Sequence, residues 1–195
     1  MNQIYFDNAA TTSVRPEVVE EMVKILTNDF GNPSSTYSIG RHTKALIETA
    51  RKTIAKQFNV ASSEIIFTSC GTEGNNWIIR SSVRDLGIKR IITTRIEHHC
   101  TLYSIQQMNK EYDTRVDYVN VLPNSEIDYS HLEDLLKDEV PTLISLMHVN
   151  NEVGTILDLK RVADLAQQYG ALFHSDTVQS VGKVEIPLDE IPLDF

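Results

Sequence analysis

Cysteine is scarce in this sequence, and so are long apolar runs. The 195 residues include two cysteines, Cys70 and Cys100, which form neither a disulfide framework nor a C-x-x-C pair. This scarcity favours a reducing, cytoplasmic setting. No apolar run approaches the roughly 18 residues that a membrane-spanning helix needs, and residues 1–12 lack the basic and apolar regions of a signal peptide. We therefore expect no membrane partner.

Positive charge is also in short supply. Lysine and arginine number 18 against 27 aspartates and glutamates, a formal net charge of -9, whereas a nucleic-acid surface needs a basic stripe that displaces counterions. The chain contains no G-x-G dinucleotide fingerprint and no Walker G-x-x-x-x-G-K-[ST] sequence. We expect no nucleic-acid partner, and any small anionic ligand must be held by local features.

The composition is that of a soluble globular protein, with 41% hydrophobic and 23% charged residues, and strand-like and helix-like segments alternate along it. The alternation is typical of βαβ units, so we expect an α/β fold: a mainly parallel sheet with helices on both faces. The strand-like segments are 4–6, 65–68, 90–94, 115–121, 142–148 and 171–173. The helix-like segments are 16–30, 39–59, 77–86 and 100–112. A further helix is expected after a Ser130/Glu133 capping box, and a last one should begin at Asp158 and end at Gly170.

The stretch 172–180 turns from apolar to polar at His174. In a parallel sheet this is how a strand leaves the core at its carboxyl end, where ligands bind. Asp176 lies at that position, with Gln179 on the next turn of chain. A carboxylate fixed there can pair with a buried cation such as the pyridinium nitrogen of pyridoxal phosphate (PLP), or it can cap the following turn.

A second candidate site is Ser69-Cys70-Gly71-Thr72-Glu73, between an expected strand and an expected helix. Small residues let backbone amides approach an anion, and a helix N-terminus favours negative charge. The segment therefore predicts a phosphate cradle with Gly71 and Thr72 as its floor. The alternative is a plain turn that Thr72 caps.

Two more polar segments follow expected strands. In Glu97-His98-His99-Cys100 an imidazole could stack on an aromatic cofactor or carry a proton, or simply lie in solvent. We expect no metal site there, because adjacent side chains diverge and no spaced ligand set accompanies them. The run His148–Gly154 offers two amides and a glutamate that can hydrogen-bond a ring oxygen or a carboxylate. Polar groups at four successive strand ends suit one anionic, aromatic ligand.

Six motifs, in order and with similar spacing, resemble the cysteine desulfurases of the NifS/IscS type within the class V aminotransferase family. The motifs are Tyr5–Thr12, Gly31–Ser35, Ser69–Glu73, Glu97-His98, His148–Gly154 and Asp176–Lys183. The resemblance implies a fold-type I PLP-dependent transferase that takes sulfur from L-cysteine, leaves alanine, and is normally a homodimer. It also implies that residues 1–13 belong to the small domain and that residues 14–195 form an incomplete PLP-binding large domain.

The resemblance further implies roles for individual residues. Cofactor contacts are implied for Gly71 and Thr72 at the phosphate, His98 against the ring, Asn151 and Gln179 at the phenolic oxygen, and Asp176 at the pyridine nitrogen. Substrate contacts are implied for Asn8, Ala9 and Asn151, and a catalytic, proton-moving role for His98. Sulfur-acceptor proteins serving iron–sulfur clusters or tRNA thiolation are implied as partners.

The sequence departs from the family pattern in two respects. Tyr37 stands where many relatives have histidine, and the chain ends before the family's Ser-x-His-Lys segment. No residue matches the Schiff-base lysine, the sulfur-accepting cysteine or the carboxylate-binding arginine, and Cys70, Cys100 and Lys183 lie at other motif positions. We therefore expect the N-terminal half of the enzyme, inactive by itself. The alternatives are a selenocysteine lyase or another class V aminotransferase, or a non-catalytic fragment or split subunit that needs a partner chain.

Overall fold

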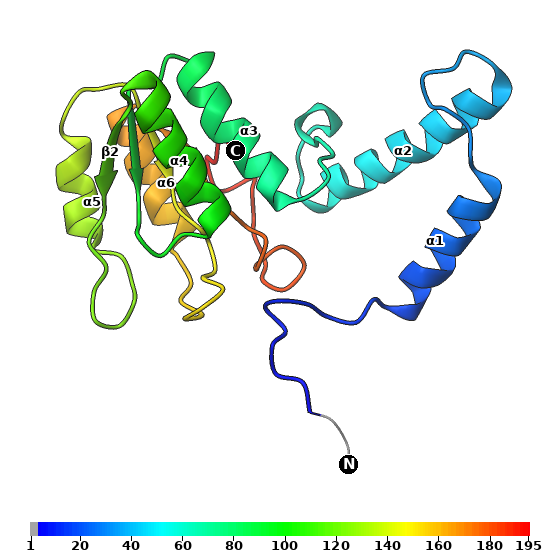
Figure 1. The fold of residues 1–195 in the computed structure, drawn as a ribbon, viewed down its shortest axis with the longest axis horizontal. Helices are drawn as coiled ribbons and strands as arrows, with labels where there is room; N and C mark the ends of the chain where they lie inside the picture. The colour runs from blue at the N-terminus through cyan, green and yellow to red at the C-terminus, as the bar shows by residue number, and fades with distance from the viewer. Residues whose placement is uncertain (1–3) are drawn as a thin grey trace. The chain divides into compact units, whose positions relative to one another are not determined.

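A computed structural model describes residues 4–195 and divides into two compact units, with the boundary between Ile66 and Phe67. Each unit is described by itself. The first three residues of the predicted small-domain segment 1–13 lie outside the described residues, and the division at residue 13 stays a prediction. Figure 1 shows the course of the chain.

The first unit contains helices α1 (Pro16–Asn28) and α2 (Ser38–Gln57) and a short 3-10 helix at Ser62–Glu64. Pro16 occupies the first helical position, where its missing N–H costs nothing. Between the helices, the predicted loop of residues 31–35 approaches α2 so closely that a Cβ on Gly40 would lie 2.5 Å from the Asn32 carbonyl oxygen. The loop therefore requires glycine at residue 40.

The strands predicted at 4–6 and 65–68 are absent from the structure. Both segments are irregular because neither joins the ladder of the sheet, and β-branched composition favours a strand only when a neighbouring strand supplies hydrogen-bond partners. The apolar stripe predicted on the first helix does form, but no residue of α1 is buried.

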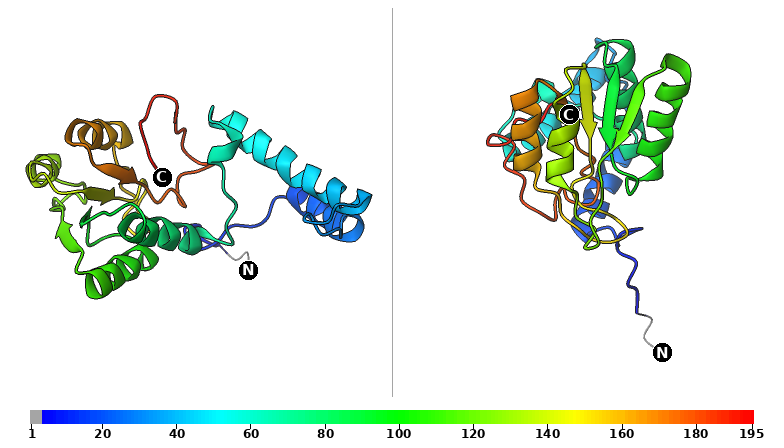
Figure 2. Two further views of the ribbon diagram at one scale, coloured as in Figure 1. Left: turned by 90° about the horizontal axis from the view of Figure 1, so that it is seen from above. Right: turned by 90° about the vertical axis from the view of Figure 1, so that its left-hand side faces the viewer.

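The second unit is built on a four-stranded sheet in the order β2-β1-β3-β4, in which every pair is parallel. The strands are β1 (Arg90–Thr93), β2 (Arg115–Tyr118), β3 (Thr142–Ser145) and β4 (Leu172–His174), and the helices are α3 (Gly71–Arg84), α4 (His99–Tyr112), α5 (Tyr129–Leu136) and α6 (Leu159–Tyr169). Helices cover both faces, as the view from above in Figure 2 shows. The predicted α/β fold is confirmed.

Alternate residues of each strand divide between two hydrophobic clusters. Ile91 and Leu143 pack with side chains of α3 and α4, whereas Ile92, Ile144 and Phe173 pack with side chains of α5 and α6. All five are fully buried. Burial on both faces explains why the two central residues of β1 and of β3 are consecutive apolar residues.

Helix caps confirm one boundary prediction and correct another. Asp158 accepts a hydrogen bond from the Arg161 amide at 3.0 Å at the start of α6, and Gly170 ends that helix with φ +64. The predicted Ser130/Glu133 capping box is wrong. Asp128 caps α5 instead, and its Oδ1 accepts from the amides of residues 130 and 131 at 3.1 Å. Because Asp128 is the residue just before the helix, its carboxylate lies within hydrogen-bonding distance of these amides.

Candidate functional site

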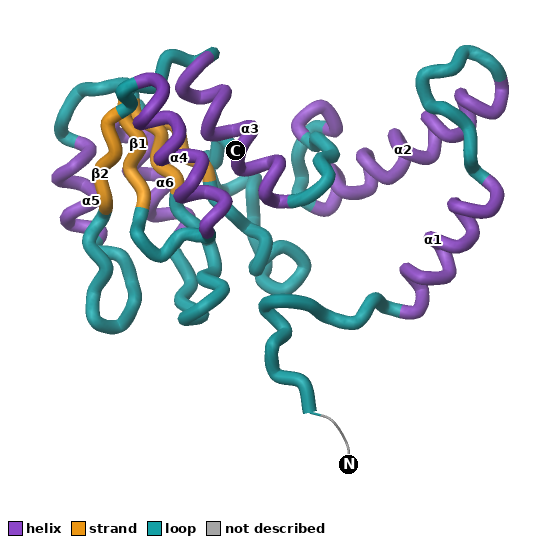
Figure 3. Tube along the Cα trace, viewed as in Figure 1, coloured by secondary structure: helices purple, strands orange, loops and turns teal. Residues whose placement is uncertain are grey.

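Four polar loops gather at one edge of the second unit. The carboxyl ends of parallel strands lie at the same edge of a sheet, and the loops after β2 and β3 leave that edge in Figure 3. Three long-range hydrogen bonds join the functional loops: Met147 N to Glu97 Oε2 at 2.8 Å, Asn150 Nδ2 to the Ile96 carbonyl at 2.8 Å, and Asn75 Nδ2 to Asp176 Oδ2 at 2.7 Å. The His148 amide also donates to the Asp176 carbonyl at 3.0 Å, so the four predicted segments are neighbours. Three of them follow strands as predicted, whereas Ser69–Glu73 follows an irregular segment, because the strand expected at 65–68 does not form.

Asp176 follows β4 and is 8% exposed. Its Oδ2 accepts from Asn75, and its Oδ1 accepts from the Val178 amide at 3.0 Å. The carboxylate thus caps the following turn, which was the alternative interpretation, while staying buried at the sheet edge. Among residues 4–195 it forms no ion pair with a lysine or arginine. A buried carboxylate without a cation is suited to a cationic ligand atom.

Behind Asp176 lies a line of buried polar groups. The Asn75 Oδ1 atom is 3.2 Å from His174 Nε2, and His174 Nδ1 is 2.9 Å from Ser145 Oγ. Complete burial lowers the pKa of His174 to about 4, so its ring is neutral. Sequence reasoning missed Asn75 and Ser145, because nothing in a local pattern indicates contacts made across the fold.

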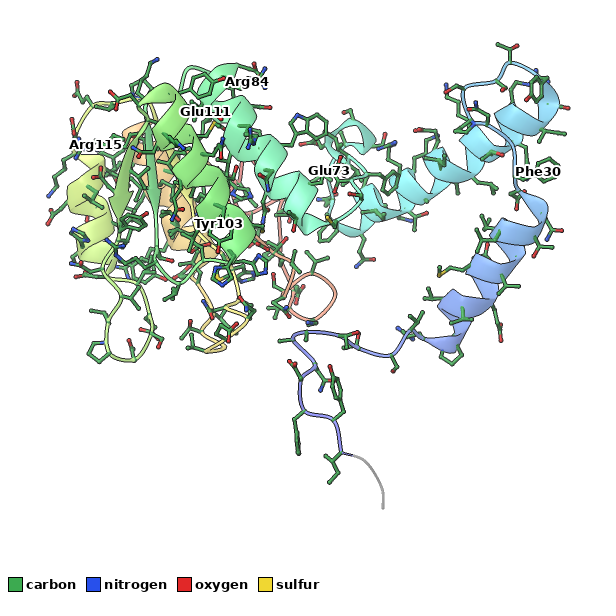
Figure 4. All side chains as sticks on the ribbon, viewed as in Figure 1. Phe30, Glu73, Arg84, Tyr103, Glu111 and Arg115 are labelled. Carbon is green, nitrogen blue, oxygen red and sulfur yellow. The ribbon has the colours of Figure 1, made fainter. Side chains whose placement is uncertain are left out.

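The residues predicted to form a phosphate cradle, Gly71 and Thr72, lie in the first turn of α3. The helix begins at Gly71 rather than at the predicted Trp77, so the small residues form its first turn, with Glu73 in it (Figure 4). A Cβ on Gly71 would lie 2.6 Å from Val178 Cγ2, which shows how closely this turn approaches the one after Asp176. The exposed Thr72 does not cap the helix; Cys70 is the N-cap residue and makes no side-chain cap bond.

The backbone amides of this turn stabilise negative charge. The Glu73 amide lowers the pKa of the Cys70 thiol, assisted by the Ser69 hydroxyl and by Thr72. The Ser69 amide, which donates to Glu73 Oε2 at 2.5 Å, lowers the pKa of the Glu73 carboxyl. These directions are the ones that an anion-binding helix start produces. The segment fits a phosphate.

His98 is the N-cap residue of α4 and its ring is exposed. Its Nδ1 accepts from the Cys100 amide at 3.2 Å and lies 3.0 Å from Cys100 Sγ. In the neutral ring the proton is therefore on Nε2, the nitrogen that remains open to a ligand. His99 instead stacks on Tyr103, with ring centroids 5.6 Å apart. The two neighbouring rings are tilted by 55° to each other, with centroids 6.2 Å apart.

Glu97 ties the His98 loop to the next strand. It is 6% exposed, and its Oε1 accepts from Thr94 Oγ1 at 2.7 Å while its Oε2 accepts from the Met147 amide. Burial raises the pKa of Glu97 to about 8, and the charge of nearby Asp176 adds to the increase. The sequence offered only the residue's place in the Glu97-His98 motif as a signal.

The two neighbouring amides of the 148–154 loop have different partners. Asn150 is buried; its Nδ2 donates to the Ile96 carbonyl and its Oδ1 accepts from the amides of residues 152 and 153 at 2.8 and 3.0 Å. Asn151 is half-buried and donates to Glu152 Oε1 at 2.8 Å. Asn150 therefore shapes the loop, whereas the predicted ligand contact of Asn151 stays a prediction.

The remaining predicted residues lie as follows. Gln179 is half-buried in the turn after Asp176, and its Oε1 accepts from Lys183 Nζ at 2.9 Å. Asn8 and Ala9 belong to the first unit, in an exposed turn, and Tyr37 is exposed at the start of α2. Their predicted roles stay predictions.

Residues 4–195 contain neither a metal-binding cluster nor a membrane-spanning helix. No cluster of three or more histidine, cysteine, aspartate or glutamate side chains is arranged to hold a metal ion. None of the helices described is both long and apolar enough to cross a membrane.

Known proteins resemble this chain along its whole length. The cysteine desulfurase IscS of Clostridium botulinum strain Hall is 39% identical over 99% of this chain and 49% of the relative, and the IscS of Dictyoglomus turgidum is 41% identical over the same shares. A solved structure described as a NifS-like protein has a TM-score of 0.91 and 36% identity, covering 99% of this chain and 54% of that one. The chain spans about half the length of the curated relatives it matches.

The family model "Aminotransferase class-V" matches residues 4–195. That match, together with the buried acidic residue and the anion-binding helix start at one sheet edge, leads to a single assignment: the chain belongs to the PLP-dependent class-V aminotransferase family.

Proposed function

We propose that this chain forms the PLP-binding part of a cysteine desulfurase, an enzyme that converts L-cysteine to L-alanine and passes the sulfur to an enzyme cysteine. Support comes from the relatives of 39% and 41% identity, both described as cysteine desulfurases. The observation that carries the proposal is the buried Asp176 carboxylate, which has no cationic partner in the described chain and faces the edge where the anion-binding turn begins.

Each residue near Asp176 has a defined task in this proposal. Asp176 pairs with the protonated pyridine nitrogen, and Gly71 and Thr72 hold the phosphate through the first turn of α3. His98 lies against the ring and moves protons at its Nε2 atom. When bound, PLP supplies an electron sink for bonding electrons released at the substrate α-carbon.

The amides complete the proposed ligand contacts. Asn151 and Gln179 donate to the phenolic oxygen of the cofactor, and Asn151 also contacts the substrate carboxylate. Asn150 is excluded from this task because its donors and acceptor already have protein partners. Asn8 and Ala9 line the substrate side. A homodimer in the cytoplasm that delivers sulfur to acceptor proteins, for iron–sulfur clusters or tRNA thiolation, completes the proposal.

The test uses the full-length protein that contains this chain. Titration with PLP, followed by the visible absorbance of bound cofactor, should show saturable binding, and L-cysteine should then yield alanine and sulfide. Asp176→Asn keeps the shape but removes the charge, and should weaken PLP binding by roughly tenfold or more, as expected for a hydrogen bond to a charged group. Asp164→Asn, at an exposed site on α6, is the control and should bind normally.

Three results would contradict the proposal. They are absence of PLP binding by the full-length protein, equal affinity in Asp176→Asn and Asp164→Asn, or turnover of L-selenocysteine with none of L-cysteine, which would favour a selenocysteine lyase. Residues 1–195 alone should release no sulfide from cysteine, since none of them matches the family's reactive lysine or sulfur-accepting cysteine.

A further inference from the structure

Four buried polar side chains form one continuous line from the sheet to Asp176. Ser145 on β3 and His174 on β4 are register partners in adjacent parallel strands, and their side chains are 2.9 Å apart. His174 Nε2 lies 3.2 Å from Asn75 Oδ1, and Asn75 Nδ2 donates to Asp176 Oδ2 at 2.7 Å. The four residues are 0%, 1%, 6% and 8% exposed, in that order. Water is therefore excluded as a competing partner for the middle two.

The chemistry of the line allows one arrangement of protons. The Asp176 carboxylate only accepts, so the Asn75 nitrogen must face it and the Asn75 oxygen must face His174. His174 must then donate from Nε2, which leaves Nδ1 as the acceptor for the Ser145 hydroxyl. The second Asn75 hydrogen points to Thr101 Oγ1 at 3.2 Å. Ser145, His174 and Asn75 thus each direct one donor along the line toward Asp176.

The reverse arrangement is unfavourable at the carboxylate. If His174 did not donate from Nε2, its lone pair would face the Asn75 oxygen, and a flip of the amide would relieve that contact. The flip would turn the Asn75 oxygen toward Asp176, placing two acceptors together without water between them. A donor at residue 174 therefore reinforces the orientation that the carboxylate favours, with the amide nitrogen toward Asp176.

We propose that His174 is a positioning residue that acts through Asn75 to orient the Asp176 carboxylate for the pyridine nitrogen of PLP. This inference rests on the proposed cofactor role of Asp176 and adds two residues, His174 and Asn75, to the machinery that serves it. Ser145 holds the far end of the line. Because two of the members are paired strand residues, the sheet itself fixes the geometry.

The experiment compares two substitutions of His174 in the full-length protein loaded with PLP. His174→Leu keeps the bulk of the side chain but cannot donate. His174→Gln restores a neutral donor near the Nε2 position. Two quantities are measured for each: the PLP dissociation constant, and the 15N chemical shift of the pyridine nitrogen in labelled cofactor, which separates the protonated from the unprotonated ring.

His174→Leu should raise the dissociation constant by roughly tenfold or more and move the nitrogen shift toward that of unprotonated pyridine. His174→Gln should return both quantities close to the wild-type values. Ser145→Ala, at the far end, should have a smaller effect than His174→Leu. A role in packing alone predicts loss of folding stability without a change in the nitrogen shift.

Specific outcomes would overturn the inference. It fails if His174→Leu has the wild-type affinity and nitrogen shift, or if His174→Gln behaves like His174→Leu. If His174→Leu does not fold, Asn75→Ala makes the same test, because it removes the donor to Asp176 directly, and an unchanged nitrogen shift refutes the inference. If the wild-type protein binds no PLP, the proposed function itself is wrong, so the two failures are distinguishable.

Discussion

Replacing Glu97 by glutamine should change how the stability of the protein depends on pH. The carboxyl is 6% exposed, and burial raises its pKa from the ordinary 4.5 to about 8. Between these values the native protein holds a proton that the unfolded chain has lost. The contribution of the protonated Glu97 carboxyl to the free energy of unfolding is therefore fully present below pH 4.5 and is lost as the pH rises through 8.

The size of the effect follows from the slope of about 1.4 kcal/mol per pH unit for one proton. His174 has the opposite sign: its pKa falls from 6.5 to about 4, so its contribution is present above pH 6.5 and is lost as the pH falls through 4. The two slopes oppose each other between pH 4.5 and 6.5. From pH 6.5 to 8 the titration of His174 no longer offsets that of Glu97. The free energy of unfolding should therefore fall by about 2 kcal/mol over this interval.

Glutamine preserves the contacts and removes the titration. Its oxygen can accept from the Met147 amide, and its nitrogen can donate to Thr94 Oγ1, the two partners that Glu97 has now. We therefore expect Glu97→Gln to keep the loop in place while its stability stays level between pH 6.5 and 8. Because burial of the ionised form no longer costs free energy, the variant should be the more stable protein at pH 8.

The assay is urea unfolding of the wild type and the variant at pH 6.5 and 8. The wild type should lose about 2 kcal/mol more than Glu97→Gln across this interval. Glu111→Gln removes an acidic group from an exposed position on α4 (Figure 4) and should parallel the wild type. Parallel pH curves for wild type and Glu97→Gln would refute the claim that Glu97 is protonated at neutral pH.

Three other substitutions test individual contacts. Gly71→Ala should leave the protein folded but weaken PLP binding in a titration, because its Cβ would lie 2.6 Å from Val178 Cγ2 and displace the turn beside the phosphate site; unchanged affinity would argue against the cradle. Asp128→Ala should cost about 1 kcal/mol in urea unfolding and Ser130→Ala almost nothing, since Asp128 is the cap of α5; equal costs would contradict this assignment. Asn150→Ala should destabilise the protein by about 1–3 kcal/mol by leaving buried backbone groups unpaired, and a neutral result in thermal unfolding would show that the loop holds without it.

The fold was largely predictable because its signals are local. Apolar strands alternating with amphipathic helices indicated a parallel sheet, and Asp158 and Gly170 marked the two ends of α6 correctly. The errors occurred where a local signal competed with a neighbour. Asp128 caps α5 ahead of Ser130, and residues 65–68 have strand composition but do not join the sheet.

The sequence predicted that polar loops meet at one edge of the sheet, but not the contacts that hold them there. Asp176 could be placed at a strand end from its own surroundings, but its partner Asn75 is 101 residues away. The same holds for Glu97 and Met147, which are 50 residues apart. Contacts of this kind depend on which strands are neighbours and on their register, and neither is written in a local pattern.

These long-range contacts have a common consequence for the site. Asn75 fixes Asp176, Glu97 fixes the loop that carries His98, and Asn150 fixes the loop that carries Asn151, through hydrogen bonds of 2.7–2.8 Å that are buried or partly buried. In the last two pairs the residue that makes the internal bond is distinct from the one proposed to contact a ligand, whereas Asp176 does both. These protein contacts hold the loops in place, which reduces the ordering that a bound ligand would have to supply.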